Sequence, residues 1–158
     1  MAMKPEESVW DYPRPPRVEP FSGLVEVEHG GYVLARSSNA YRVLETSHPP
    51  VLYIPPQDIK MELLKKTDRT SNCEFKGVAV YYDLAAPGLY VDNTAWSYEN
   101  PRQGYEAIKE HLAFYPSKMD ACYVDGEKVK PQEGDFYGGW ITANIKGPFK
   151  GAPGAQGW

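Results

Sequence analysis

The sequence lacks the features that mark several large classes of protein. It has only 2 cysteines, Cys73 and Cys122, in 158 residues. They are too few for a disulfide framework and lack the paired Cys-x-x-Cys spacing of a zinc site. No apolar run approaches the roughly 18 residues of a membrane span. The net charge is -4, and Lys and Arg form no cluster suited to phosphate backbones. We expect reduced thiols and no metal, cofactor, nucleic acid or membrane partner.

The first residues also lack the apolar stretch of a secretory signal, because the segment 1–17 is charged and rich in proline. We therefore expect a soluble, cytoplasmic protein, and the length fits a single domain with one hydrophobic core. What the chain has in abundance is 12 Tyr, 4 Trp, 15 Pro and 14 Gly. Aromatic side chains favour strands, whereas Gly and Pro interrupt regular elements. The composition predicts many short strands joined by turns.

Two turn signals predict β-hairpins. The alternating segment 24–28 and the strand-like segment 32–36 are separated by His29-Gly30-Gly31. The strand-like segments 121–124 and 127–130 are separated by Asp125-Gly126. Both pairs of turn residues suit the positive φ angles of a tight hairpin.

The remaining periodicity predicts short strands and little helix. Segments 51–54, 77–84, 95–98 and 112–115 read as strands. The spacing of Ile59, Leu63 and Leu64 predicts a helix over 57–66, and 105–111 could form one or two helical turns. The predicted fold class is mainly β, a compact single domain of short antiparallel strands with one or two short helices.

Three regions are expected along the chain. Residues 1–20 form a Pro-rich arm, residues 21–137 the β-rich core, and residues 138–158 a Gly-rich and aromatic extension. Trp140, Phe149 and Trp158 would each cost roughly 1.5–3 kcal/mol if left in water, so we expect this extension to pack on the core. A dimer formed through the tail would satisfy the same argument, which leaves a homo-oligomer as an alternative.

Several local phrases occur together and in a fixed order. They are Trp10-x-Tyr12-Pro13-Arg14-Pro15-Pro16-Arg17, Val43-Leu44-Glu45-Thr46, Leu52-Tyr53-Ile54-Pro55, Thr70-Ser71-Asn72-Cys73-Glu74-Phe75-Lys76-Gly77, Ala95-Trp96-Ser97-Tyr98, Ala113-Phe114-Tyr115 and Val124-Asp125-Gly126. With this set, the chain resembles the domain-of-unknown-function 427 family over roughly residues 10–130. The Gly-Gly-Trp and Gly-Pro-Phe-Lys-Gly phrases of the tail look like the extension of fungal members.

The resemblance implies a β-tent-like fold, in which two sheets lean together. Relatives of that architecture often hold zinc through two Cys-x-x-Cys knuckles, which this sequence lacks, so the shape carries over and the metal does not. A family label suggests nucleotidyl transfer. The Gly-Ser and spaced-carboxylate pattern by which such enzymes hold metal ions does not occur here. The resemblance therefore supplies a fold and a candidate site.

The segment 70–77 is the chemically densest part of the chain. A cation near Cys73 would make its thiol more nucleophilic, and Lys76 could hold an anionic ligand group. Alternatively, Cys73 is a small buried hydrophobic residue, which is the commoner state of a free cysteine. Glu45 stands in an apolar phrase and either pairs with Lys76 or Arg42 or faces a cavity.

Aromatic residues with polar tips suit a pocket around a planar ligand. We expect one concavity to collect a ligand-binding set, namely Glu45, Tyr53, Thr70, Lys76, Tyr81, Trp96 and Tyr98. The candidate catalytic residues are Cys73, Lys76 and Glu45. A pair of Cys73 with His48 or His111 is a further alternative, which no spacing in the sequence supports.

The function predicted from these residues is the binding of a small polar molecule in an aromatic-lined pocket. One alternative is an enzyme that uses the same pocket through Cys73, Lys76 and Glu45. The other is a protein-interaction domain that acts through the Pro-rich arm or the aromatic tail.

Overall fold

The computed structural model describes residues 5–132 and 138–149. In this part of the chain every regular element is a β-strand or a single 3-10 turn, and no α-helix occurs. No helix in these residues is long and apolar enough to cross a membrane. The prediction of a mainly β fold of short antiparallel strands is confirmed.

The strands are β1 (Glu7–Ser8), β2 (Arg17–Phe21), β3 (Val25–His29), β4 (Tyr32–Ser37), β5 (Ala40–Leu44), β6 (Val51–Tyr53), β7 (Leu64–Cys73), β8 (Gly77–Ala86), β9 (Leu89–Ser97), β10 (Leu112–Phe114), β11 (Ala121–Val124), β12 (Glu127–Lys128), β13 (Lys130–Pro131), β14 (Trp140–Ile141) and β15 (Ile145–Lys146). The 3-10 helices are η1 (Val9–Asp11), η2 (Pro56–Asp58), η3 (Met61–Leu63), η4 (Glu106–Ile108) and η5 (Pro116–Lys118).

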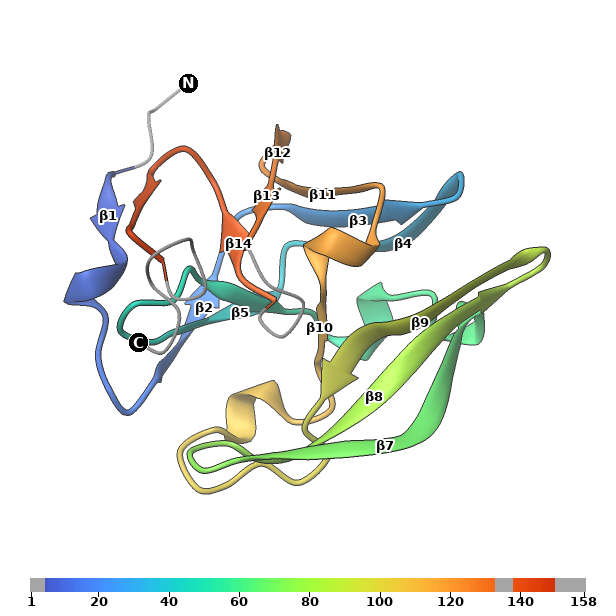
Figure 1. Ribbon diagram of the computed structural model, residues 1–158, viewed down its shortest axis with the longest axis horizontal. Helices are drawn as coiled ribbons and strands as arrows, with labels where there is room; N and C mark the ends of the chain where they lie inside the picture. Colours follow the sequence, from blue (N-terminus) through green and yellow to red (C-terminus); the bar gives the residue numbers. More distant parts are fainter. Residues whose placement is uncertain (1–4, 133–137, 150–158) are drawn as a thin grey trace.

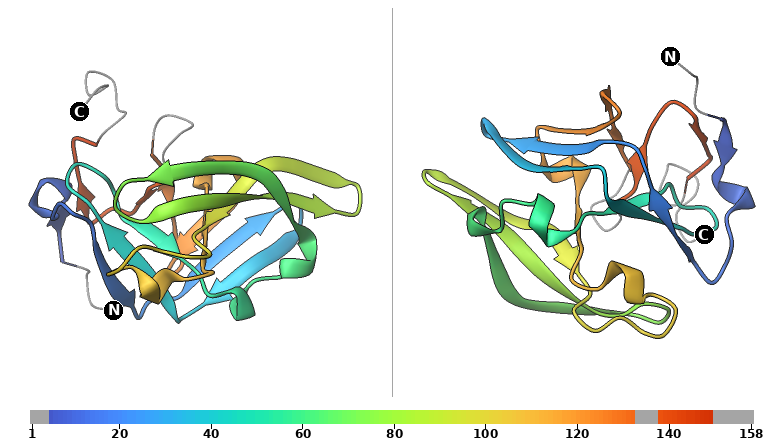
Figure 2. Two further views of the ribbon diagram at one scale, coloured as in Figure 1. Left: turned by 90° about the horizontal axis from the view of Figure 1, so that it is seen from below. Right: turned by 180° about the vertical axis from the view of Figure 1, so that it is seen from behind.

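The strands form two four-stranded sheets and three smaller ones (Figure 1). One large sheet has the order β10-β9-β8-β7, and the other has the order β12-β11-β3-β4. A three-stranded sheet, β2-β5-β6, lies beside them, and β13 pairs with β14. Strand β1 pairs with β15 in parallel, so the two ends of the described chain meet at one edge (Figure 2).

The main hydrophobic core lies between the two large sheets. Val25 and Val27 of β3 and Leu34 of β4 belong to the same buried cluster as Leu84 of β8 and Phe114 of β10. Alternate residues of a strand face opposite sides of its sheet, which is why β3 buries Val25 and Val27 but not Glu26 between them.

The β10-β9-β8-β7 sheet is joined to β6 by one pair of backbone hydrogen bonds. The amide of Ile54 donates to the carbonyl of Leu112 at 2.8 Å, and the amide of Leu112 donates to the carbonyl of Ile54 at 2.9 Å. Both side chains are fully buried. This junction brings Tyr53 at the end of β6 close to the sheet that carries Trp96.

Both predicted hairpins are present. Strands β3 and β4 are joined at Gly30 and Gly31, whose φ angles are 59° and 84°. Strands β11 and β12 are joined at Asp125 and Gly126, whose φ angles are 49° and 82°. Positive φ at both central residues matches the tight turns that suit the right-handed twist of paired strands.

The predicted helix over 57–66 is wrong. Two 3-10 turns, η2 and η3, occupy its first part, and β7 begins at Leu64. Ile59, buried in the main core, bridges to Ala35, and the amide of Lys60 donates to the carbonyl of Leu34 at 2.8 Å. These tertiary bonds replace the internal bonds of a helix, which would be marginal at this length. The turns expected at 105–111 amount to one, η4.

The two ends of the described chain contact the body of the domain. Residues 17–20, which we expected in the arm, belong to β2 and pair with β5. Trp140 is 1% exposed and belongs to the main core, and Phe149 packs against a small cluster around Val9. Trp158 lies outside the described residues, so the packing of the whole segment 138–158 stays a prediction.

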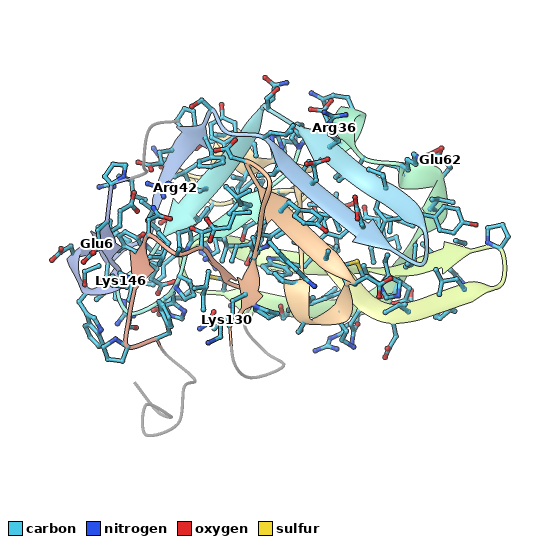
Figure 3. The ribbon with its side chains drawn as sticks, turned by 90° about the horizontal axis from the view of Figure 1, so that it is seen from above. Glu6, Arg36, Arg42, Glu62, Lys130 and Lys146 are labelled. Atoms are coloured by element: carbon cyan, nitrogen blue, oxygen red, sulfur yellow. The ribbon has the colours of Figure 1, made fainter. Side chains whose placement is uncertain are left out.

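Arg42 on β5 is the centre of a half-buried charge network (Figure 3). Its side chain contacts Glu7 at 3.0 Å and Glu19 at 2.6 Å, and Tyr12 donates to Glu7 at 2.6 Å. Burial alone would raise the pKa of Glu7, but the hydrogen bonds from Arg42 and Tyr12 outweigh it and lower that pKa. The network ties β1 and β2 to β5.

The lowered pKa of Glu7 predicts a specific loss of stability in acid. A carboxylate whose pKa is lower in the folded state stabilises the fold above its unfolded pKa, and this contribution disappears as pH falls through the folded value. Glu7→Gln should therefore reduce stability at neutral pH and make the decline below about pH 5 shallower. Urea unfolding at a series of pH values measures this. The exposed Glu6→Gln is the control, and parallel curves for Glu7→Gln and the wild type would contradict the assignment.

Candidate functional site

A pocket of about 530 Å³ opens on the face of β8 and β9 that turns towards β6. Its walls come from the end of β5 and the loop after it, from β6, from the β7–β8 hairpin, from β9 and from the chain after β10. The residues on either side of the undescribed segment, Gln132 and Gly138, complete the lining. The volume lies within the roughly 300–1,000 Å³ of small-molecule sites.

Most of the residues named from the sequence lie around this one pocket. Those that line it are Glu45, Tyr53, Cys73, Lys76, Tyr81, Trp96 and Tyr98. They come from segments more than fifty residues apart, and the junction between β6 and β10 brings them together.

Thr70 does not line the pocket, and that part of the expected set is corrected. It is exposed on β7, where it pairs with Val80, whereas Ser71 lines the pocket and lies 2.8 Å from the hydroxyl of Tyr81. Side chains alternate along a strand, so Ser71 and Cys73 share one face of β7 and Thr70 lies on the other. Asn72, which has the parity of Thr70, borders the pocket only at the hairpin end of the strand.

Lys76 is placed by the turn between β7 and β8. Its carbonyl accepts a hydrogen bond from the amide of Arg102 at 2.9 Å, which fixes the hairpin tip to the following loop. Gly77 has a φ of 110° and a Cβ there would lie 3.5 Å from Arg102, so the turn requires glycine. Lys76 is 8% exposed. In the described part of the chain its ammonium has neither an ion pair nor a hydrogen bond.

Glu45 has a partner other than the two expected from the sequence. Its carboxylate lies 3.5 Å from the guanidinium of Arg14, while Arg42 is bound to Glu7 and Glu19. Arg14 comes from the Pro-rich segment and also donates to the carbonyl of Thr46. The structural pairing of Glu45 with Lys76 or Arg42 is therefore wrong, and Lys76 remains as the cation of the pocket.

Six aromatic residues surround the cavity, and they hold one another in place. Trp96 donates from Nε1 to the hydroxyl of Tyr53 at 3.3 Å, and the two rings meet edge to face at 6.2 Å. Trp96 also lies against Tyr115, with ring centroids 4.6 Å apart. Tyr98 and Phe75 complete the set together with Tyr81, over whose ring Arg69 lies at 4.7 Å. Rings fixed in this way form a rigid wall.

The tyrosine hydroxyls of this wall are neutral. Burial raises the pKa of Tyr53, Tyr98 and Tyr115. Neighbouring groups, Cys73 among them, raise the pKa of Tyr98 further. At neutral pH these residues therefore act as hydrogen-bonding phenols and contribute no negative charge to the pocket.

Cys73 is half-buried and lines the pocket together with Tyr98. Of the two histidines considered as its partner, His48 lines the same pocket. His111 instead packs edge-on against Tyr41, with ring centroids 5.7 Å apart. Only His48 is therefore placed to share chemistry with Cys73.

The lining residues missed by sequence reasoning are Val51, Ser71, Asn72, Glu74, Phe75, Tyr115, Gln132 and Gly138. Strand parity would have identified Ser71. Gly138 carries a different signal, because a Cβ at that position would overlap the indole of Trp96. The backbone of Gly138 passes so close to Trp96 that only glycine fits there. This contact joins residues far apart in sequence, so it could not be predicted without the fold.

No group of three or more His, Cys, Asp and Glu side chains gathers in a metal-binding arrangement within residues 5–132 and 138–149. The polar residues that line the pocket are Glu45, His48, Ser71, Asn72, Cys73, Glu74, Lys76 and Gln132, together with the tyrosine hydroxyls.

Comparison with known proteins agrees with the resemblance seen in the sequence. A family model described as a domain of unknown function, DUF427, matches residues 17–125. Comparison with curated proteins gives no match. The matched segment spans β2 to the turn after β11 and so includes most of the pocket. It stops before the tail, where the likeness to fungal members stays a prediction. The match covers more than half of the chain, and the protein therefore belongs to the DUF427 family.

Proposed function

We propose that this domain binds a small, negatively charged molecule in the pocket, with Lys76 as the counter-charge. The observation that carries the proposal is the burial of Lys76 without a partner in the described part of the chain. Removing an ammonium from water is costly unless a charge or a hydrogen-bond acceptor compensates it. A bound anion would supply that compensation.

The surrounding residues support the same proposal. The hairpin tip is fixed through Arg102, and Gly77 allows the turn that brings Lys76 to the cavity. Glu45, the other polar anchor expected from the sequence, lies on the same pocket with its charge offset by Arg14. A preformed concavity in which polar groups converge on an aromatic wall is a common form of small-molecule site.

Replacing Lys76 with methionine tests the proposal, because methionine keeps the length of the side chain and removes its charge. Lys76→Met should raise the free energy of unfolding by about 1 kcal/mol, since an uncompensated buried charge is lost. It should also weaken the binding of small organic acids, detected by ligand-observed NMR, to that of their neutral analogues. The panel contains carboxylates, phenyl phosphate and their neutral analogues.

The exposed Lys128→Met on β12 is the matched control and should change neither property. A clear fall in stability on Lys76→Met, with binding of the panel unchanged, would make Lys76 a structural residue and end the proposal.

Catalysis in the same pocket is the second candidate. Cys73 and His48 both line it, which places a nucleophile and a base around one bound molecule. Chemical conversion of a compound that binds the wild-type pocket, lost in Cys73→Ser, would separate catalysis from binding alone.

A further inference from the structure

The charges around the pocket restrict the ligand that it can hold. Lys76 is the single cationic side chain among the described lining residues, and two carboxylates, Glu45 and Glu74, line the same space. Arg14 offsets Glu45 from outside the lining. Sites for di- and triphosphates use several cationic groups or a loop of convergent backbone amides. A single ammonium suits a ligand with a single negative charge, and Glu74 in the same lining repels each further negative charge.

The walls restrict the shape of the ligand. Trp96, Tyr53 and Tyr115 are mutually packed, at 6.2 Å for the first pair of rings and 4.6 Å for Trp96 and Tyr115. The hydroxyl of Tyr53 accepts from Trp96, and the hydroxyls of Tyr81 and Ser71 share a hydrogen bond. The wall therefore offers fixed ring faces and edges, which favour a flat aromatic body.

The burial of Lys76 adds a condition on the charged group. Lys76 as a whole residue is 8% exposed, so an anion bound by its side chain is itself largely removed from water. A monovalent carboxylate loses less hydration than a multiply charged phosphate chain, and a charge-assisted bond to the ammonium offsets that loss.

We propose that the ligand is a flat aromatic monocarboxylate, whose carboxylate binds Lys76 and whose ring packs against Trp96 and Tyr98. This rests on the proposed function, which requires only some small anion. It names the chemical class and excludes nucleoside triphosphates as occupants of this pocket.

Isothermal titration of the full chain with matched probes tests the class. The probes are 2-naphthoate, its neutral amide 2-naphthamide, the saturated decahydro-2-naphthoate, inorganic phosphate and adenosine triphosphate with and without magnesium. Naphthoate should bind the wild type at least about tenfold more tightly than the amide or the saturated acid, because the amide lacks the charge-assisted bond and the saturated acid lacks the flat ring. Phosphate and the triphosphate should show no binding. In Lys76→Met, naphthoate and naphthamide should bind alike.

The titration distinguishes results that contradict only the aromatic monocarboxylate from results that contradict the proposed anion site as well. Tighter binding of phosphate or the triphosphate, lost in Lys76→Met, would overturn the aromatic monocarboxylate and leave the anion site standing. Equal binding of the saturated acid would overturn the requirement for a flat ring. If no anion binds in a manner that depends on Lys76, both this inference and the proposed function are wrong.

Discussion

Replacing Trp140 with alanine should lower the free energy of unfolding by about 3–5 kcal/mol, the usual cost of deleting a large buried aromatic side chain. Trp140 is 1% exposed, and its indole Nε1 donates to the carbonyl of Phe114 at 3.1 Å. Its backbone amide donates to the carbonyl of Pro50 at 2.8 Å. The alanine variant therefore creates a cavity in the main core and leaves a buried carbonyl without its donor. Urea unfolding measures the loss.

Two variants make this result specific. Trp140→Phe keeps a ring but removes the donor to Phe114, so its loss should be smaller than that of Trp140→Ala. Trp10→Ala removes a tryptophan that is 44% exposed and should cost less than about 1 kcal/mol. A loss below about 1 kcal/mol for Trp140→Ala would show that the chain after residue 138 does not unfold with the core.

Replacing Arg42 with methionine should cost about 3 kcal/mol of stability, because it breaks a half-buried ion-pair network from one side only. The guanidinium makes three bonds to carboxylate oxygens, at 3.1 and 3.0 Å to Glu7 and at 2.6 Å to Glu19. Its side chain is 15% exposed. Without Arg42, Glu7 loses the cation it is paired with, and Glu19 keeps only the more exposed Arg17 at 3.5 Å. Equilibrium unfolding at neutral pH measures the effect.

Arg36→Met is the matched control for this network. Arg36 lies 3.8 Å from Glu26 and its side chain is 67% exposed, so its loss should change stability by less than about 0.5 kcal/mol. The triple variant Glu7→Gln, Glu19→Gln, Arg42→Met should recover part of the loss, since it removes the unpaired charges as well. If the triple variant were no more stable than Arg42→Met, the network would act through packing alone.

The two hairpins were predictable because the residues of each turn, and not contacts from distant segments, determine the backbone conformation there. Asp125-Gly126 and Gly30-Gly31 require positive φ angles whatever surrounds them, and the strands on either side follow from alternation. The helix predicted over 57–66 was wrong because the same apolar spacing suits both a helix and an extended chain that packs on a core. The extended form is stabilised by a hydrogen bond from the amide of Lys60 to the carbonyl of Leu34, which is distant in sequence.

The site was predictable in its residue types and only partly in its members. Polar groups within aromatic, strand-forming phrases pointed to Lys76, Glu45 and the tyrosines. Thr70 was wrongly predicted to line the pocket because its polar side chain is close to Cys73 in sequence. In the structure both residues belong to β7, where they lie on opposite faces. The partner of Glu45 depends on where the Pro-rich segment passes, and no local pattern places Arg14 there.

The three described tryptophans lie in different environments, so the intrinsic fluorescence of the protein can report on the pocket. Trp96 lies in the wall of the pocket, whereas Trp140 is sealed in the main core and Trp10 lies on the surface near the N-terminus. An aromatic molecule seated in the pocket would therefore alter the fluorescence of Trp96 and leave the emission of Trp140 unchanged. Occupancy could be followed in solution without a label, and an external quencher would reach Trp10 before it reached Trp96 or Trp140.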